Sequence, residues 1–518
     1  MKHRRYSALL LILVLILSLF AACGKDDGNS GDDSSPVAVH NKDGLFSLGY
    51  DPDYGLNPYS MTDANNHMVS ALMYDTIFEV DNNFKVSSRI IEEYETEDGL
   101  WWVFTVDTSI PFHDGSKLTA QDVAYSLQKA VSSNMYSARL EGVYGISALS
   151  QDTFAVSLVS ANMQLPSLMT VPVIKDGSAG DRVPCGTGPY MLNSTNDSLI
   201  VFEDYYAAKT LPIETICLKS YSDRSDMVSK FEASTIDIMI NEPLSSSPIE
   251  CKSSFSSYYY NMTNLHFLGF NEDSPFFSFK ENRRALNHAI DREHLVSDVF
   301  DNCAIITTLP IHPASQYYNQ ELANTLKYDV KTAKRILKDA SVRDYDSDGM
   351  LEFMYNSTVT ETDLKFIVCN ASSQKIYAAR QITLDLQNMG LNVTLHELSW
   401  NDYMQALKDG DYDIYYGEIK LTPDFNLYAL FGSNGKVNYF NRDATNYDSY
   451  IFNYLTASDE NRSMQADLMC QYIASDTVMV PICFSFGELI TSSGVISDIA
   501  ASQYDTFYNI ENWSITLK

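Results

Sequence analysis

The chain has 518 residues and a formal net charge of −31 at pH 7. A surface this acidic repels phosphate backbones, so nucleic acid is excluded as an expected partner. The length suits two or three domains, and 45% of hydrophobic residues is the level of an ordinary soluble protein.

The N-terminal residues 1–22 form a predicted secretion signal peptide. A basic start precedes an apolar run, residues 8–22, that is too short for a typical transmembrane span. The run ends in small residues before Cys23, which resembles the lipobox of bacterial lipoproteins and predicts lipidation of Cys23. An uncleaved N-terminal anchor is the alternative. Residues 23–44 are then a lipidated Cys followed by a flexible tether, because their Gly, Ser, Asp and Asn cannot form a core.

A strand, a turn and a capped helix are predicted in the next informative stretch. Residues 101–106 alternate like a strand, and Gly115 marks a turn. Thr119, followed three residues later by Asp122, forms a capping-box pattern. Apolar residues then recur at helical spacing as far as Val131.

Helices and strands continue to alternate along the chain. A helix is expected over 329–340 with Asp329 as its cap, and another over 376–389 with Gly390 as its stop. A strand over 391–395 follows at once. This alternation predicts an α/β fold with layers of helices on sheets.

Cysteine usage favours thiols that pack as small hydrophobic residues. The seven cysteines after Cys23 include no C-x-x-C pair, and an odd number cannot all be paired within the chain. Several lie in apolar surroundings, where a buried Cys is expected rather than a disulfide or a metal ligand. They are Cys185, Cys217, Cys251, Cys303, Cys369, Cys470 and Cys483.

No motif of catalysis or cofactor binding is present. The sequence lacks a G-x-S-x-G elbow, an H-E-x-x-H helix and a phosphate-binding glycine loop. Residues 344–349, DYDSDG, resemble the start of a calcium loop, but Tyr355 stands where the bidentate Glu is needed. A polar turn is therefore expected there, and we predict no catalytic residue, no metal ligand and no cofactor. A cell-surface hydrolase is disfavoured on the same grounds.

A series of motifs, in order along nearly the whole chain, carries a family resemblance. The longest are PFHDGSKLTAQDVAYSL at 111–127 and RRALNHAIDREHLV at 283–296. Others lie at 186–190, 229–238, 311–314, 328–340, 410–414 and 479–482. Together they resemble the family 5 extracellular solute-binding proteins, which capture peptides, nickel complexes or other small solutes for ABC importers.

The resemblance implies a two-lobed, type II periplasmic-binding-protein-like (Venus flytrap) fold. Lobe one would span 45–264 with an inserted subdomain at about 75–168, and lobe two would span 265–485. Residues 486–518 would return to lobe one. The implied function is an extracellular substrate-binding lipoprotein that captures oligopeptides and delivers them to ABC permease subunits. The implied place is the outer face of the bacterial cytoplasmic membrane, held by a lipid anchor only, as a monomer.

The segment that should carry ligand specificity departs from the family pattern. Residues 416–426 lack the family's usual Trp and anchoring Asp and contain instead Glu418, Lys420 and Asp424. In a strand, Glu418 and Lys420 would share one face. We expect Glu418 or Asp424 to contact a cationic group of the ligand, and Lys420 an anionic one. The alternative is a solvated or internally paired cluster.

Two further segments are site candidates by their resemblance to cleft residues of the family. Asn57 and Tyr59 lie in a loop after the first strand, and Asn438 and Tyr439 resemble a cleft-lining pair. The ligand itself stays open. Nickel chelates or another small solute are the first alternative, and a peptide-sensing signalling receptor is the second.

Overall fold

One mixed sheet of eleven strands runs through the part of the chain that this computed structural model describes, residues 44–439 and 444–517. These residues fall within a single compact unit. The predicted signal peptide, the lipidation site Cys23 and the tether up to residue 43 lie outside the described residues. Among the described helices, none has the length and hydropathy that a bilayer crossing requires.

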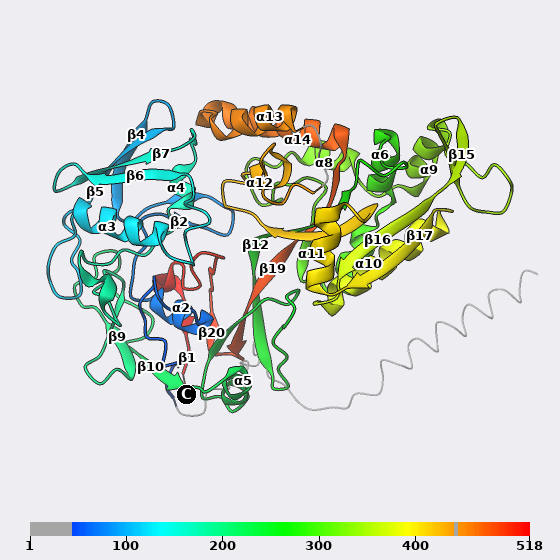
Figure 1. Ribbon diagram of the computed structural model, residues 1–518. Helices are drawn as coiled ribbons and strands as arrows, with labels where there is room; N and C mark the ends of the chain where they lie inside the picture. Colours follow the sequence, from blue (N-terminus) through cyan, green and yellow to red (C-terminus); the bar gives the residue numbers. More distant parts are fainter. Residues whose placement is uncertain (1–43, 440–443, 518) are drawn as a thin grey trace, which may run out of the picture. The chain divides into compact units, whose positions relative to one another are not determined.

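The strands of this sheet come from widely separated parts of the sequence (Figure 1). In spatial order they are β17 (Asn392–Leu398), β16 (Asp363–Cys369), β18 (Ile414–Lys420), β12 (Phe255–Phe270), β19 (Met479–Ser492), β11 (Ile238–Asn241), β1 (Ser47–Tyr50), β10 (Thr215–Ser220), β9 (Ser198–Val201) and β8 (Tyr190–Leu192), with β13 (Ala304–Ile306) paired to β19.

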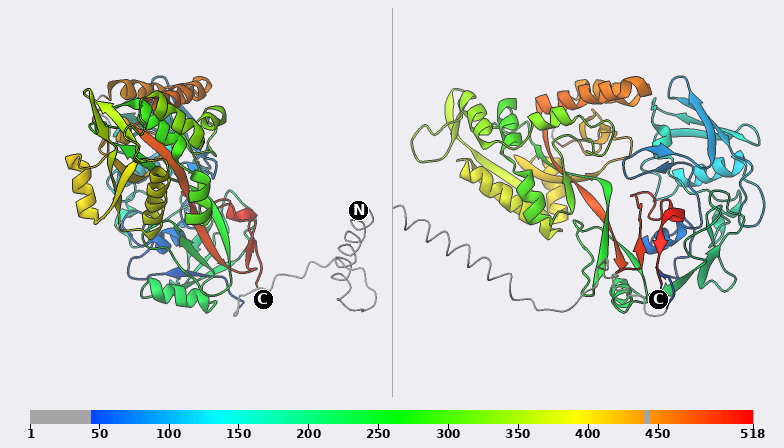
Figure 2. Two further views of the ribbon diagram at one scale, coloured as in Figure 1. Left: turned by 90° about the vertical axis from the view of Figure 1, so that its right-hand side faces the viewer. Right: turned by 180° about the vertical axis from the view of Figure 1, so that it is seen from behind.

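Two long antiparallel strands, β12 and β19, join the two halves of the sheet (Figures 1 and 2). Near its end β12 pairs with β18, over Asn264–Phe270, whereas β19 pairs with β11 near its own end, over Glu488–Thr491. The β12–β19 register shifts between Asn261 and Leu265, at the crossing from one half to the other. A bulge there bends the pair and increases its twist. We call the half with β1 and β8–β11 lobe one, and the half with β16–β18 lobe two.

A smaller antiparallel sheet follows β1 along the chain. Its order is β4 (Ile91–Thr96), β5 (Trp101–Val106), β7 (Thr153–Leu158) and β6 (Val143–Ala148). Helix α3 (Ala120–Val131) packs on it with Val123, Leu127 and Ala130 buried. The predicted capping box is confirmed, since the Asp122 carboxylate accepts the Thr119 N–H at 2.9 Å.

Lobe two packs helices on both faces of β16–β18, with a separate hydrophobic cluster on each face. The predicted helix after Asp329 is α9 (Val330–Asp339), whose first turn that carboxylate caps. The predicted helix over 376–389 is α10 (Ser373–Asn388). It starts earlier because Ser372 caps it, and Gly390 follows in a left-handed conformation with φ 97°.

The remaining elements are short or cover the edges of the two lobes. In lobe one and its C-terminal segment they are α2 (Ala64–Ser70), β2 (Glu79–Val80), β3 (Val86–Ser87), α4 (Leu165–Leu168), η1 (Ser178–Gly180), α5 (Arg224–Glu232), β20 (Ile496–Ser497), η3 (Ile510–Asn512) and β21 (Ser514–Ile515). In lobe two they are α6 (Lys280–Ala289), α7 (Arg292–His294), η2 (Leu295–Val299), α8 (Gln320–Thr325), β14 (Glu352–Tyr355), β15 (Thr358–Glu361), α11 (Trp400–Asp409), α12 (Tyr428–Phe431), α13 (Thr445–Leu455) and α14 (Asp459–Asp476).

Within the described residues, all seven cysteines are free thiols. Cys303, Cys470 and Cys483 are buried, and burial raises the pKa of each thiol. The remaining four are partly buried. The three buried thiols pack as the small hydrophobic residues that the sequence favours.

Candidate ligand-binding cleft

Strand β18 carries two of the predicted site residues on one face, as its alternation requires. Glu418 lies opposite His266 of β12, and Lys420 lies opposite Asn264. The neighbouring β12 side chains therefore share this face and set the surroundings of both charges.

Glu418 is an ionised carboxylate with internal partners. It pairs with the Lys375 ammonium, accepts a hydrogen bond from Asn264 Nδ2 at 2.9 Å and lies 3.8 Å from His266 Nε2. Burial acts to raise the pKa of Glu418, but His266, Lys375 and Asn264 together lower that pKa to about 2. The Lys375 contact corresponds to the internally paired alternative for this residue.

His266 is completely buried between Glu418 and Tyr416. Burial lowers the pKa of His266 to about 4, although Glu418 acts in the opposite direction. The imidazole is therefore neutral at pH 7, with Nδ1 3.0 Å from the Tyr416 hydroxyl and Nε2 without a hydrogen-bond partner.

Lys420, at the end of β18, lies in different surroundings. Its side chain is exposed and forms neither an ion pair nor a hydrogen bond with the described residues. Burial nevertheless lowers the pKa of Lys420, with Glu242 acting against this shift and Arg139 adding to it. The Lys420 ammonium is thus partly desolvated although its side chain reaches solvent, and Arg139 of lobe one is near enough to act on its charge.

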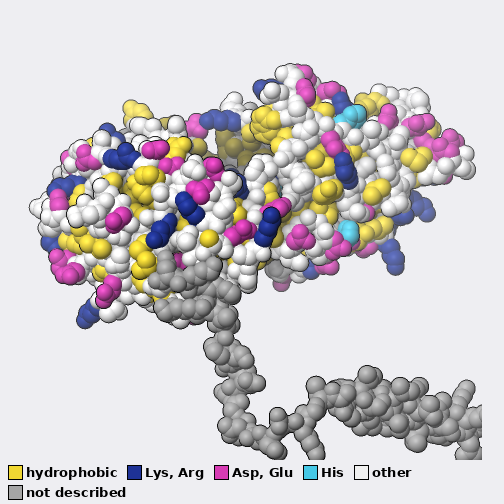
Figure 3. Space-filling view, turned by 90° about the horizontal axis from the view of Figure 1, so that it is seen from below, with side chains coloured by type: hydrophobic (Ala, Val, Ile, Leu, Met, Phe, Trp, Pro, Cys, Tyr) yellow, Lys and Arg dark blue, Asp and Glu magenta, His cyan; other side chains and the backbone are white. Residues whose placement is uncertain are grey.

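Three segments that are far apart in sequence come together at the end of β18. Leu421, next to Lys420, donates its N–H to the Thr263 carbonyl at 3.0 Å. The Thr263 N–H donates to Gln503 Oε1 at 2.7 Å, which brings the C-terminal segment to the end of β18. Tyr504 follows Gln503, and its ring lies 5.9 Å from the Arg139 guanidinium. Figure 3 shows a hollow on one face of the molecule with Lys and Arg side chains beside it.

Arg139 is a residue of this site that the sequence did not reveal. It follows α3 in the loop before β6, and its guanidinium lies 5.0 Å from the Tyr136 ring. It donates to the Thr170 carbonyl at 2.5 Å, while its Nε is buried without a partner. No spacing in the sequence marks it, because its surroundings depend on Tyr504, far away in the chain.

Three other predicted site residues use their polar atoms in contacts with the protein. Asn57 is 3% exposed, and its Nδ2 donates to the Ala179 and Asp181 carbonyls at 3.0 and 2.8 Å. The Tyr59 hydroxyl donates to the Pro172 carbonyl, and burial raises its pKa.

Asp424 is the third of these residues. It is 1% exposed and accepts from Asn162 Nδ2 at 3.0 Å and Thr422 Oγ1 at 2.5 Å. Burial raises the pKa of this carboxyl. Ligand contact by Asn57, Tyr59 and Asp424 stays a prediction.

The last two candidates lie beside a short segment, 440–443, outside the described residues. Asn438 Nδ2 donates to the Gly432 carbonyl at 3.1 Å, and the Tyr439 carbonyl accepts from the Tyr412 hydroxyl. These contacts hold the pair within lobe two. The structure therefore brings Glu418 and Lys420 together, with Arg139, and gives the other five candidates separate local partners.

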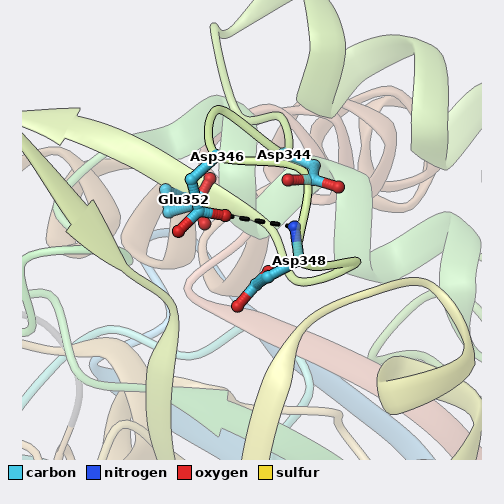
Figure 4. Close-up of side chains that lie close together, drawn as sticks. All are labelled: Asp344, Asp346, Asp348 and Glu352. Carbon is cyan, nitrogen blue, oxygen red and sulfur yellow. Dashed lines mark hydrogen bonds between the residues drawn. The ribbon is translucent and has the colours of Figure 1, made fainter.

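The acidic turn at 344–352 gathers four carboxylates. Oxygens of Asp344, Asp346, Asp348 and Glu352 lie within 4.8 Å of one another (Figure 4). The three Asp are exposed, and their oxygens accept backbone N–H groups of the same turn, such as Gly349 to Asp344 at 3.0 Å. Glu352 accepts from the Tyr345 N–H at 2.6 Å. The arrangement is that of the polar turn expected from the sequence, leading into β14.

A separate groove of about 680 Å³ lies among α6, α8 and α9 in lobe two. Its lining is open and mixed in charge, with Arg284, His288 and Asp329 among it. None of the predicted site residues lines this groove. The end of β18, which carries Glu418 and Lys420, is therefore the better candidate.

Comparison with known proteins agrees with this architecture. The middle-region model of the bacterial extracellular solute-binding proteins, family 5, matches residues 85–438. The oligopeptide-binding protein AppA of Bacillus subtilis is 22% identical over 445 residues, which cover 80% of this chain and 80% of AppA. Heme-binding protein A of Haemophilus influenzae is 21% identical over 473 residues, covering 82% and 84%.

A solved structure shows the same fold. The nickel ABC transporter structure from Bacillus halodurans superposes with a TM-score of 0.73 at 15% identity, covering 89% of this chain and 98% of that one. The predicted two-lobed α/β fold is thereby confirmed, and the family points to a binding protein rather than an enzyme. The chain belongs to the bacterial extracellular solute-binding proteins, family 5.

Proposed function

We propose that this chain is the substrate-binding lipoprotein of an ABC importer and that it captures oligopeptides between its lobes. The observation that carries the proposal is the charged end of β18, where the charge of Arg139 acts on Lys420 and the Arg139 guanidinium lies 5.9 Å from the Tyr504 ring. A relative of similar length, AppA, is an oligopeptide-binding protein. The lipid on Cys23 would hold the protein at the outer face of the cytoplasmic membrane, beside its permease.

Capture in this proposal depends on closure of the two lobes. The lobes are joined by β12 and β19, whose register shift at Asn261 gives a place to bend. A ligand stabilises the closed state only through contacts with both lobes. The end of β18 is such a place, because it adjoins segments on either side of the connection.

Nickel chelates, or another small solute, remain the second candidate. Heme-binding protein A and the nickel transporter structure belong among the similar proteins. A chelated metal is held through its organic ligand, so the charged end of β18 could accept one without His or Cys ligands from the chain. A peptide-sensing receptor that signals rather than transports would share the same cleft.

A thermal-shift experiment separates the ligand classes. The full-length chain, purified in mild detergent, is heated with an oligopeptide library, nickel–histidine, hemin or buffer alone. A ligand present at about 100 times its Kd adds about 2.7 kcal/mol to the free energy of unfolding, which raises Tm measurably. A rise with peptides alone supports the proposal. A rise only with nickel–histidine or hemin would replace oligopeptides by that solute.

A further inference from the structure

Two segments of lobe one make direct contacts with lobe two. The first is the tip of the β2–β3 hairpin, where the centre of the Phe84 ring lies 4.9 Å from that of His312 and 5.1 Å from that of Phe425. Both partners are buried and belong to a hydrophobic cluster of lobe two, against which Phe84 packs. Val86, two residues further along the hairpin, packs instead on the inserted sheet of lobe one. One aromatic side chain of this hairpin therefore reaches the other lobe.

The backbone of the hairpin tip holds Phe84 in this position. The Asp81 carboxylate accepts the N–H groups of Asn83 and Lys85 at 2.8 and 2.9 Å, which fixes the turn. Phe84 itself has φ 62°, in the left-handed region that a bulky residue rarely adopts. A residue held there costs free energy that surrounding contacts must offset, and such residues cluster at functional sites. The packing of Phe84 against lobe two supplies contacts of this kind.

The same hairpin is tied to the connection between the lobes. Asn82 Oδ1 accepts the Asn261 N–H at 2.6 Å, and the Asn82 carbonyl accepts from Asn261 Nδ2 at 2.7 Å. Asn261 lies at the register shift of β12 and β19, where the pair can bend. Because the hairpin is anchored at this bend and Phe84 packs beyond it, opening of the lobes separates Phe84 from lobe two.

The second segment is residues 162–164, between β7 and α4. The Met163 N–H donates to the Leu455 carbonyl of α13 at 2.8 Å. Asn162 Nδ2 donates to Asp424 Oδ2 at 3.0 Å, and both of these side chains are buried. Loss of a buried hydrogen bond is costly, because the groups left behind are shielded from water. Lobe one is therefore bonded to lobe two through backbone and side-chain groups at a place well separated in sequence from Phe84.

We propose that Phe84 and residues 162–164 form an interlobe clasp that holds the two lobes closed through contacts of the chain itself. The clasp joins protein atoms to protein atoms, so it stabilises the closed state whichever solute is captured. A solute then enters during brief openings, and its association rate is limited by the rate at which the clasp opens. A solute that binds the closed lobes benefits, because little of its binding free energy is needed for closure.

Hydrogen exchange at the Met163 amide measures opening of the clasp directly. This N–H is bonded across the lobes, so it exchanges with deuterium when residues 162–164 leave lobe two. Exchange is measured on the full-length chain in mild detergent, without added solute, by mass spectrometry at single-residue resolution. Amides that bond between β12 and β19 are the internal reference, because they exchange when the sheet itself opens. Each Met163 rate is divided by the reference rate of the same variant.

We expect Met163 to be protected in the wild type and to exchange about tenfold faster in Phe84→Ala, which loses the apolar contact of a partly buried ring. Asn162→Ala removes a donor from the buried Asp424 carboxylate and should have a similar effect. Phe84→Leu keeps an apolar side chain against lobe two and should change the rate less than about threefold. Val86→Ala is the matched control and should leave Met163 at the wild-type rate, because Val86 packs within lobe one.

Three results would overturn the clasp. They are unprotected exchange of Met163 in the wild type, wild-type exchange in both Phe84→Ala and Asn162→Ala, and equal acceleration by Val86→Ala and Phe84→Ala. The last would show that a loosened hairpin, rather than contact with lobe two, controls the rate. If Phe84→Ala does not fold, Asn162→Ala and the wild-type protection decide. Solute capture is tested separately by the thermal shift, so failure of either proposal leaves the other in place.

Discussion

Replacement of Asp424 by Ala distinguishes a scaffold role from a ligand role for this carboxylate. Its oxygens accept from Asn162 Nδ2, Thr422 Oγ1 and the Asn426 N–H. Asn162 is itself buried, so its amide would lose its acceptor without gaining water. That loss costs about 1–3 kcal/mol, and the two partly exposed donors add about 0.5–1.5 kcal/mol each.

The total is reduced because the variant no longer buries a carboxylate. We therefore expect Asp424→Ala to lower the free energy of unfolding by about 2–4 kcal/mol. Urea denaturation monitored by circular dichroism gives this value, with an unchanged slope against urea concentration. Asp424→Asn keeps the shape and one acceptor, so it serves as the milder control. A stability loss below about 1 kcal/mol, together with ligand binding weakened about tenfold, would refute the scaffold role.

Three further predictions concern pH and packing. The folded-state pKa of Glu418 is depressed to about 2 from the unfolded value of 4.5. The Glu418 carboxylate therefore adds to the free energy of unfolding above pH 4.5, and this contribution is lost as pH falls toward 2. Glu418→Gln should therefore reduce the loss of unfolding free energy in that pH window by about 1–2 kcal/mol, a value lowered because the side chain is partly exposed. Identical pH profiles of the variant and the wild type would contradict this. Burial depresses the pKa of His312 to about 3 from 6.5, so stability falls as pH drops from 6.5 toward 3, and His312→Gln should flatten the unfolding profile there. In Gly186→Ala, the new Cβ would lie 2.2 Å from the Met73 carbonyl oxygen. Urea denaturation should therefore show a free energy of unfolding lowered by more than about 2 kcal/mol. An unchanged free energy of unfolding would contradict the close packing.

Local sequence signals predicted the helices and turns well. Thr119 with Asp122, Asp329 before α9 and Gly390 after α10 each act within a few residues, so the sequence contains the whole interaction. Glu418 and Lys420 were expected to share a face if their segment formed a strand, and in β18 they do. Such features depend on backbone geometry and short-range bonds, which do not require knowledge of the fold.

The partners of the site residues could not be predicted in the same way. Asn57 bonds to carbonyls more than 120 residues away, and Glu418 pairs with Lys375 from another element. The surroundings of Arg139 include the ring of Tyr504, a residue near the other end of the chain. A sequence pattern gives the charge of a side chain, but only tertiary contacts decide whether that charge is already neutralised.

The position of β19 between β11 and β12 has a consequence for the order of folding. These contacts join residues 238–241 and 255–270 to a strand that is synthesised late, at 479–492. Until that strand arrives, β11 and β12 each have an open edge, and neither lobe can complete its part of the sheet. Both lobes therefore depend on the last segments of the chain, and contacts so distant in sequence make folding slow. A chain truncated before Met479 should expose these edges and aggregate rather than yield a single folded lobe.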